Sequence, residues 1–379
     1  MAPASMRAMR YHGKPELVLD DVSLPQLKPG EVRVKVAFCG ICGSDLHEVF
    51  EGPLTCCPVG QPHPLTGGTL PETLGHEFSG VVEELGEGVE EDGEGTEGRR
   101  TLRVGSRVCI EPVISCRQCD ACKAGDTPLC DLAIGLYGYA RPGGLAPFVN
   151  VASSNVHVVP DNVPLDIAAL AEPLSVAWHA VAVSGFKMGE SAFVIGCGPI
   201  GALVTRVLFA QGASAVYVSE PSASRRAIAS QCGATAVFDP TTDDALARVR
   251  EATGGQGVDV AIDCAGTQRT VDAAIESTRR KGRIVMVALF DKAKRPTVDM
   301  WALMTKERTL TSSCCFNAED MRQVLAALSS GRIKVDDLIT CRIALSEVFD
   351  KGLEVLRQDP TQVKILVDLE REAVQPASL

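Results

Sequence analysis

One glycine-rich segment, residues 196–201, constrains the fold of this 379-residue chain more than any other feature. It follows a short apolar segment, Ala192–Ile195, and opens a helix-like segment, Ile200–Gln211. A G-x-G-x-x-G pattern between a strand and a helix is typical of a turn that binds a dinucleotide. The first glycine permits a tight turn, the second lets a pyrophosphate approach the backbone, and the third lets helix and strand pack closely. A proline in the first helical turn costs little, because its missing N–H would be unpaired there. The predicted coenzyme turn consists of Gly196, Cys197, Gly198, Pro199, Ile200 and Gly201.

Strands and helices alternate on the C-terminal side of this turn. Apolar, strand-like segments occur at Ala215–Val218, Val258–Ile262 and Arg283–Val287, and helix-like segments such as Ser222–Cys232 lie between them. Such alternation is typical of a parallel sheet covered by helices on both faces. The sequence therefore predicts an α/β chain with a Rossmann-type, doubly wound coenzyme domain.

The residue after the second predicted strand bears on the choice of coenzyme. Glu220 lies 24 residues after Gly196, where a carboxylate accepts hydrogen bonds from the ribose hydroxyls and repels a 2′-phosphate. Arg225 and Arg226 are a counter-signal, because a guanidinium at this place could hold that phosphate. We expect NAD rather than NADP, since the acid holds the strand-end position. The alternative is a glycine turn without a ligand, and the strand, helix and acid together argue against it.

The first part of the chain has a different pattern. Glu31–Val36 alternates polar and apolar residues, as a half-buried strand does. Further short strand-like segments lie between glycines and prolines, at Gly80–Val82, Arg107–Ile110 and Ala146–Val151. We expect an irregular antiparallel, barrel-like domain. After residue 316 a helix at Ala318–Ser329 and a strand at Val363–Val367 remain, and these segments can return to the first domain.

Four cysteines within fifteen residues form a C-x2-C-x2-C-x7-C cluster, made by Cys116, Cys119, Cys122 and Cys130. The chain has 15 cysteines, and in a reducing compartment clustered cysteines more often bind a metal than form disulfides. Four thiolates close a tetrahedral shell that leaves no position for a substrate, which is typical of a structural zinc site. An iron–sulfur cluster is the alternative, but the seven-residue gap does not match the ferredoxin patterns.

A second set of metal-binding side chains is dispersed along the chain. Cys42, Ser44 and His47 lie within six residues, His76 and Glu77 are adjacent, and a further acid, Glu172, precedes the coenzyme domain. Each of these residues alone has an ordinary structural interpretation as a core cysteine, a polar histidine or a helix cap. Together they supply the mixed sulfur, nitrogen and oxygen ligands that suit a zinc ion with one open position.

These segments together resemble the zinc-containing medium-chain dehydrogenase/reductase superfamily along essentially the whole chain. The resemblance is strongest to its 2,3-butanediol dehydrogenase and sorbitol dehydrogenase branch, and the butanediol assignment depends mainly on the insertion His63-Pro-Leu-Thr-Gly67. The segments that carry the resemblance are Cys39–His47, His63–Gly67, Leu74–Gly80, the four-cysteine cluster, Ala171–Val176 and Gly196–Gly201.

The resemblance implies a domain organisation. Residues 1–172 would form a GroES-like, β-rich catalytic domain, with a structural-zinc lobe at about residues 109–131. Residues 173–316 would form the Rossmann NAD-binding domain, and residues 317–379 would return to complete the catalytic domain. A homodimer or homotetramer, joined through edge strands of the coenzyme domains, is expected on the same ground.

The resemblance also assigns the dispersed residues. Cys42, rather than Cys39, and His76 would bind the catalytic zinc, with Glu172 where liver-type alcohol dehydrogenases have a second cysteine. Glu77 would enter the metal shell when Glu172 leaves it. Ser44 and His47 would pass the alcohol proton to water through the ribose hydroxyls, and Lys364 would lie against the coenzyme pyrophosphate. The implied catalytic set is Cys42, Ser44, His47, His76, Glu77 and Glu172.

The implied activity is NAD-linked oxidation of a secondary alcohol. The substrate we expect is 2,3-butanediol, which is oxidised to acetoin, with the reverse reduction. A polyol dehydrogenase for sorbitol or xylitol and a threonine-type dehydrogenase share the same groups and remain alternatives. A structural protein that only binds a dinucleotide is the non-enzyme alternative, which the complete set of candidate catalytic residues disfavours.

Charge and hydropathy limit the other partners. The net charge is −11, of which eight acidic residues fall within Glu83–Gly98, so we expect one solvated surface loop there. The sequence has no basic stripe of the kind that predicts nucleic-acid binding, and it has no apolar run that approaches the roughly 20 residues that span a bilayer. With no secretory signal in residues 1–14, we expect a cytoplasmic protein with a small diol or hydroxyketone substrate.

Overall fold

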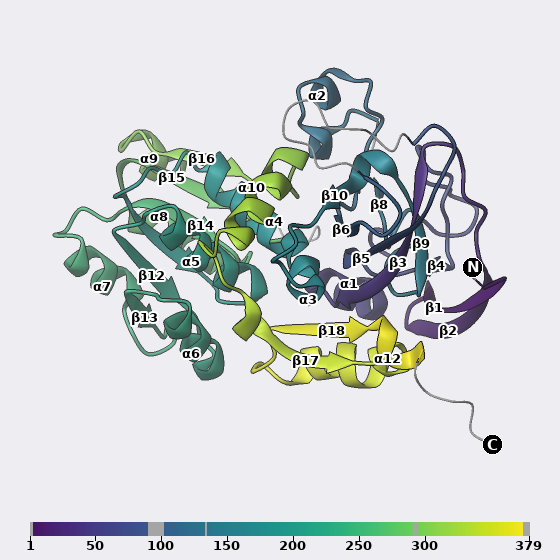
Figure 1. The fold of residues 1–379 in the computed structure, drawn as a ribbon. Coiled ribbons are helices and arrows are strands. Elements are labelled where there is room, and N and C mark those ends of the chain that lie inside the picture. The colour runs from purple at the N-terminus through teal and green to yellow at the C-terminus, as the bar shows by residue number, and fades with distance from the viewer. Residues whose placement is uncertain (1–2, 90–101, 133–134, 291–294, 374–379) are drawn as a thin grey trace. The chain divides into compact units, whose positions relative to one another are not determined.

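The computed structural model describes residues 3–89, 102–132, 135–290 and 295–373 (Figure 1). The chain divides into two compact units. Both chain ends, Met1–Glu172 and Asn317–Leu379, form the terminal unit, and Pro173–Phe316 forms the central unit.

The central unit is built on one sheet of six parallel strands. In the order in which they lie side by side, the strands are β13 (Ala236–Phe238), β12 (Ala215–Ser219), β11 (Ser191–Ile195), β14 (Val258–Asp263), β15 (Thr278–Met286) and β16 (Thr309–Ser312). The helices of this unit are α5 (Pro199–Ala210), α6 (Ala223–Gln231), α7 (Ala245–Ala252), α8 (Gln268–Ser277), α9 (Met300–Met304) and α4 (Ala171–Val183), which begins at the end of the terminal unit. The strand order reverses between β11 and β14, and open parallel sheets bind ligands at such a switch point.

Two glycines in the turn after β11 have the conformations that the sequence predicts. Gly196 has a positive φ of 89°, which a residue with a side chain rarely adopts. A Cβ atom on Gly201 would lie 2.0 Å from the carbonyl oxygen of Gly196, so only glycine permits this approach of helix to strand. The predicted Rossmann-type parallel sheet is therefore confirmed.

The terminal unit is β-rich. Its largest sheet has seven strands, in the order β10-β6-β5-β3-β18-β17, with β9 also paired to β3. These strands are β3 (Glu31–Gly40), β5 (Glu77–Leu85), β6 (Arg107–Ile110), β9 (Phe148–Ala152), β10 (Val156–Val158), β17 (Ile339–Ile343) and β18 (Lys364–Asp368). Two smaller sheets contain β1 (Ser5–Gly13), β2 (Glu16–Ser23) and β4 (Glu72–Thr73), and β7 (Val113–Ile114) and β8 (Gly135–Leu136).

Short helices connect these strands. The α-helices are α1 (Gly43–Glu51), α2 (Asp120–Lys123), α3 (Leu165–Ala169), α10 (Ala318–Ser329), α11 (Glu354–Gln358) and α12 (Leu369–Ala373). The 3-10 turns are η1 (Thr127–Leu129), η2 (Ser153–Asn155), η3 (Asp336–Leu338) and η4 (Leu345–Glu347), and η5 (Val348–Leu353) is a π-helix. No helix in the described part of the chain is long and apolar enough to cross a membrane.

The two chain ends share one sheet. Strand β18 runs antiparallel to β3, with Val367 opposite Cys39, so the yellow C-terminal segment lies beside the purple N-terminal part in Figure 1. Ile365, Leu366 and Val367 are fully buried. Burial of such side chains contributes roughly 1.5–3 kcal/mol each, so the returning strand is part of the core of this unit.

Two local expectations differ from the structure. The alanine-rich run Ala168–Ala182, which by composition is expected to be one helix, is divided. Helix α3 ends at Ala169 and α4 begins at Ala171, two residues before Pro173, which has no N–H to continue a helix from the preceding turn. The acidic segment is not all loop, because Glu83 and Glu84 belong to β5 and Glu84 pairs with Arg33. Residues 90–98 of that segment lie outside the described residues.

Candidate functional site

Three of the predicted metal ligands meet at the ends of two paired strands. Glu77 begins β5 opposite Gly40 at the end of β3, His76 precedes it, and Cys42 is the N-cap of α1. One ligand atom from each of Cys42, His76 and Glu77 lies within 4.8 Å of the others. His76 and Glu77 are buried and Cys42 is half-buried.

Glycines beside the ligands make this approach possible. A Cβ atom on Gly40 would lie 2.1 Å from Oε2 of Glu77. Gly75, with a φ of 95°, would place a Cβ atom 2.6 Å from the sulfur of Cys39. Cys39, the alternative thiol, is fully buried, and its sulfur donates to the carbonyl oxygen of Gly40 at 3.6 Å. It is Cys42 that lies in the group with His76 and Glu77.

Glu172 is buried near this group but does not belong to the 4.8 Å cluster of described residues. Burial raises the pKa of its carboxyl group to about 8. The charge of His76 lowers that pKa and the charge of Glu77 raises it, so Glu172 lies within electrostatic range of both. A buried carboxyl group held beside a second acid is a ready ligand for a cation that would neutralise both.

Asp45, which the sequence analysis did not single out, supports the cluster. Its Oδ2 accepts a hydrogen bond from the backbone N–H of Cys42 at 2.9 Å, and its Oδ1 lies 3.6 Å from Nδ1 of His76. Burial raises the pKa of Asp45, but the charge of His76 and the hydrogen bonds from Cys42 and Tyr139 together outweigh burial and lower the pKa. The capping pattern, an acid three residues after the N-cap, is the sequence signal that could have identified it.

The donor set fits a zinc ion. Nδ1 of His76 is buried and makes no hydrogen bond, although the carboxylate of Asp45 faces it. A histidine that binds a metal through one ring nitrogen commonly directs the other to a carboxylate. A thiol, an imidazole and carboxylates are the ligand types of catalytic zinc sites.

Ser44 and His47 lie one turn apart on α1 and have different surroundings. Oγ of Ser44 is 3.4 Å from Nε2 of His76, beside the cluster. His47 is 55% exposed, and its Nδ1 lies 3.1 Å from a carboxylate oxygen of Glu51. Ser44 therefore faces the cluster and His47 faces solvent.

Lys364 is paired with one of the predicted metal ligands. Its Nζ donates to both carboxylate oxygens of Glu77, at 2.7 and 2.6 Å, and to the carbonyl oxygen of Ile41. Burial lowers the pKa of this amine, but the charge of Glu77, its hydrogen bonds and the other nearby acidic groups together outweigh burial and raise the pKa. A place for Lys364 against the coenzyme pyrophosphate stays a prediction.

The four-cysteine cluster is closed on itself. The sulfurs of Cys116, Cys119, Cys122 and Cys130 all lie within 4.8 Å of one another. Backbone N–H groups point at these sulfurs, among them that of Cys116 toward Cys130 and that of Cys119 toward Cys116, each at 3.4 Å. Four convergent sulfurs that accept backbone N–H bonds are suited to a metal held as a thiolate complex.

In the central unit, Glu220 is tied to the glycine turn. Its carboxylate accepts the N–H of Cys197 at 2.7 Å and the N–H of Ser222 at 2.9 Å. Arg226, one of the two arginines considered as a phosphate ligand, instead forms an ion pair with Asp239 at 2.9 Å and donates to the carbonyl oxygen of Glu220. Arg225 is half-buried on α6.

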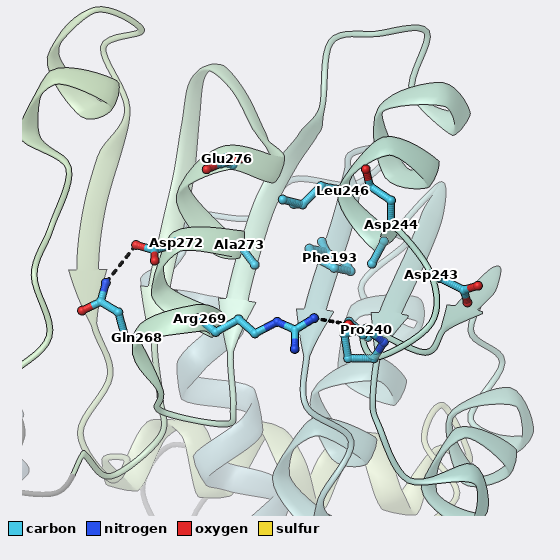
Figure 2. Close-up of a pocket in the computed structure, with 12 residues that line it drawn as sticks. Phe193, Pro240, Asp243, Asp244, Leu246, Gln268, Arg269, Asp272, Ala273 and Glu276 are labelled. Carbon is cyan, nitrogen blue, oxygen red and sulfur yellow. Dashed lines mark hydrogen bonds between the residues drawn. The ribbon is translucent and has the colours of Figure 1, made fainter.

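The central unit has a cavity of about 500 Å³, whose lining includes Ser219, the residue before Glu220 (Figure 2). Ser219, the last residue of β12, and Phe193 of β11 line it, together with Pro240, the first turn of α7 and one face of α8 along its length. Figure 2 shows Arg269 extending from α8 to donate to the carbonyl oxygen of Pro240. The acidic side chains that line the cavity are Asp243, Asp244, Asp272 and Glu276.

Comparison with known proteins places the sequence among dehydrogenases. The family described as "Alcohol dehydrogenase GroES-like domain" matches residues 28–161, and the one described as "Zinc-binding dehydrogenase" matches residues 199–330. The (R,R)-butanediol dehydrogenase of Bacillus subtilis strain 168 is 38% identical over 363 residues, covering 96% of this chain and 99% of that protein. The (R,R)-butanediol dehydrogenase of Neisseria gonorrhoeae is 36% identical over 370 residues, with 96% and 99% covered.

Solved structures agree with these matches. The crystal structure of 2R,3R-butanediol dehydrogenase from Bacillus subtilis has a TM-score of 0.88 and 37% identity, covering 96% of this chain and 100% of that one. A zinc-binding dehydrogenase of Sinorhizobium meliloti 1021, bound to NADP, has a TM-score of 0.84 and 29% identity, covering 97% of this chain and 100% of that one. An alcohol dehydrogenase of Escherichia coli CFT073, complexed with NADH, has a TM-score of 0.84 and 26% identity, with the same coverage.

The buried Lys364–Glu77 pair predicts a measurable loss of stability. Lys364→Met leaves Glu77 buried and unpaired, which typically costs about 3–5 kcal/mol of unfolding free energy. Lys35→Met, on neighbouring β3, removes a half-exposed lysine that lies 3.8 Å from Glu370, and such pairs contribute about 0–1 kcal/mol. Urea unfolding of both variants measures the difference. Equal losses of unfolding free energy in the two variants would mean that the buried pair stabilises the protein no more than the exposed pair does.

Proposed function

We propose that this chain, which belongs to the zinc-dependent medium-chain dehydrogenase/reductase family, interconverts 2,3-butanediol and acetoin with NAD. It acts as an oxidoreductase on CH–OH donors, with zinc and a nicotinamide coenzyme. The observation that carries the proposal is the Cys42–His76–Glu77 cluster, with Glu172 beside it. The proposed substrate class is that of two relatives named as butanediol dehydrogenases, which match this chain over nearly their whole length.

Two zinc ions are proposed for each chain. Cys42, His76 and Glu172 hold the catalytic ion, and Glu77 takes the place of Glu172 when the latter withdraws. Cys116, Cys119, Cys122 and Cys130 hold the structural ion, since four sulfurs leave no position for a substrate.

When bound, zinc supplies a Lewis acid and the nicotinamide ring accepts a hydride. The residues of the chain orient the alcohol and carry its proton. Ser44, beside His76, is within reach of a hydroxyl group placed at the cluster. His47 is exposed on the same helix, so it can pass a proton to water through the ribose hydroxyls. Glu51, at 3.1 Å, holds the His47 ring in place.

NAD rather than NADP is proposed as the coenzyme. Glu220 is buried between two backbone N–H groups at the end of β12, where its charge would meet a ribose 2′ substituent. Four carboxylates line the adjoining cavity, in which the adenine end of the coenzyme would lie, and they disfavour a further negative charge. The turn from Gly196 to Gly201, with Gly198, Pro199 and Ile200 at the start of α5, would hold the pyrophosphate.

The first experiment follows NADH formation with 2,3-butanediol stereoisomers, sorbitol, xylitol, threonine and ethanol, before and after zinc removal. We expect the highest kcat/KM for a butanediol isomer, loss of activity on chelation, and two zinc ions per chain by metal analysis. Preference for sorbitol, xylitol or threonine would retain the site and refute the butanediol assignment. Binding of dinucleotide without oxidation of any alcohol would leave only a binding protein.

Coenzyme selection has its own test. Glu220→Ser removes the carboxylate that accepts from Cys197 and Ser222, so kcat/KM with NAD should fall roughly 10-fold or more, as expected for a charged hydrogen-bond partner. The ratio of NADP to NAD use should rise. Glu251→Ser, on the exposed surface of α7, is the control and should change neither value. If the ratio of NADP to NAD use stays constant in Glu220→Ser, Arg225 rather than Glu220 would determine the choice of coenzyme.

A homodimer or homotetramer is proposed through the edge of the central sheet. Strand β16 is an edge strand, and α9, which ends four residues before it, exposes Met300 (66%), Trp301 (71%) and Met304 (63%). Adjacent exposed apolar side chains of this size commonly mark an interface. A cytoplasmic location stays a prediction from the sequence.

Oligomerisation is tested with Trp301→Glu. Placing a charge in the apolar patch should convert the assembly to monomers in sedimentation velocity experiments. Met188→Glu, at a site of the same unit that is 83% exposed, should leave the assembly intact. A wild-type monomer at micromolar concentration, or two variants that behave alike, would refute this interface.

A further inference from the structure

The hydroxyl group of Tyr139 is buried beside the cluster, and the proposed mechanism does not use it. We propose that Tyr139 is a positioning residue, which orients Ser44 and Asp45 at the zinc site and is itself held in place by the loop of residues 63–68, called here the His63 loop. The proposal rests on the metal site assigned under the proposed function.

Tyr139 joins two side chains that flank the cluster. Its ring is 2% exposed, and its hydroxyl oxygen lies 2.8 Å from Oδ1 of Asp45 and 2.9 Å from Oγ of Ser44. A carboxylate can only accept, so the single phenolic hydrogen satisfies Asp45 while Ser44 remains within hydrogen-bond distance of the same oxygen. The ring also packs against His76, with 5.2 Å between the ring centroids.

Asp45 transmits this contact to the ligands. Its second oxygen, Oδ2, accepts the backbone N–H of Cys42, and the oxygen that accepts from Tyr139 is also the one that faces Nδ1 of His76. The position of this carboxylate therefore sets the direction in which His76 points. Partners in this outer layer typically change metal affinity by about 10–100-fold when they are removed.

The backbone around Tyr139 is locked onto the residue that precedes His76. A Cβ atom on Gly143 would lie 2.1 Å from the carbonyl oxygen of Gly75, and one on Gly138 would lie 2.9 Å from the carbonyl carbon of Gly75. The N–H of Gly144 donates to the same Gly75 oxygen at 2.8 Å. These contacts leave little freedom for the tyrosine to move relative to the zinc ligands.

The His63 loop holds the other side of the tyrosine segment. Oγ1 of Thr66 donates to the carbonyl oxygen of Ala140 at 2.6 Å, and a Cβ atom on Gly68 would lie 2.2 Å from that oxygen. The N–H of His63 donates to Gly68 and the N–H of Gly67 donates back to His63, at 3.0 and 2.8 Å, so the loop is closed. The insertion that distinguishes this chain by sequence thus contacts the residue that follows Tyr139.

Tyr139→Phe tests the proposal, because it keeps the ring and removes only the hydroxyl group. Tyr137→Phe is the matched control: that ring is also 2% exposed, and its oxygen accepts from the N–H of Ala152 at 2.8 Å without contacting the cluster. For each variant we would measure the rate of zinc loss to a chelator, kcat, the KM for the alcohol and for NAD, and the thermal midpoint.

We expect Tyr139→Phe to accelerate loss of the catalytic zinc by about 10-fold and to lower kcat, with the KM for NAD unchanged. Tyr137→Phe should lower the thermal midpoint at least as much as Tyr139→Phe does, without changing the rate of zinc loss. Zinc loss that is unaffected in Tyr139→Phe, or equally accelerated in Tyr137→Phe, would overturn the positioning role.

A second variant tests the loop. Thr66→Val removes the hydroxyl group that anchors Ala140 at a half-buried position and should accelerate zinc loss in the same direction, by less than Tyr139→Phe. Wild-type zinc loss from Thr66→Val would refute the contribution of the His63 loop. A wild-type protein that binds zinc but oxidises no alcohol would refute the proposed function, while the zinc-loss measurements would still decide the role of Tyr139.

Discussion

A buried ion pair between Lys364 and Glu77 ties the last strand of the terminal unit to its metal-binding cluster. Lys364 begins β18 and Glu77 begins β5, on strands that are 287 residues apart in sequence and lie on either side of β3. Two charges removed from water are tolerated only when they are paired closely and hydrogen-bonded further, as the carbonyl oxygen of Ile41 does for this lysine. The charge of Glu77 is therefore neutralised only when the C-terminal segment has returned to the sheet.

The ligands are then oriented by contacts in which glycine is as important as the polar side chains. Gly40 leaves room for the carboxylate of Glu77, and Gly75 and Gly143 allow the segment around Tyr139 to approach the backbone before His76. Asp45 and Tyr139 occupy the space so defined. A metal site of this kind needs ligand positions fixed within fractions of an ångström, and backbone-to-backbone contact is stiffer than contact through flexible side chains.

Much of this arrangement could be predicted from local sequence. The glycine turn, the strands Arg107–Ile110 and Ser191–Ile195 and the helix Ala318–Ser329 follow from periodicity and turn chemistry over a few residues, and the structure has them close to the predicted positions. The short strands β13 and β16 were not predicted, because few residues define them, and neither was the hairpin of β1 and β2, whose strands are stabilised by pairing with each other. Tyr139 was missed because neither periodicity nor a metal-ligand pattern marks it.

By itself the sequence determined which chemistry this protein can carry: the thiols, imidazole and carboxylates of two candidate metal clusters and a glycine turn for a nicotinamide coenzyme, since each follows from residue types at short spacing. Only the tertiary structure decided how they are used. It separates Cys42 from Cys39, pairs Lys364 with Glu77 and brings Tyr139 and the His63 loop to the metal ligands. Those contacts join residues far apart in the chain, and burial, rather than local propensity, determines their partners.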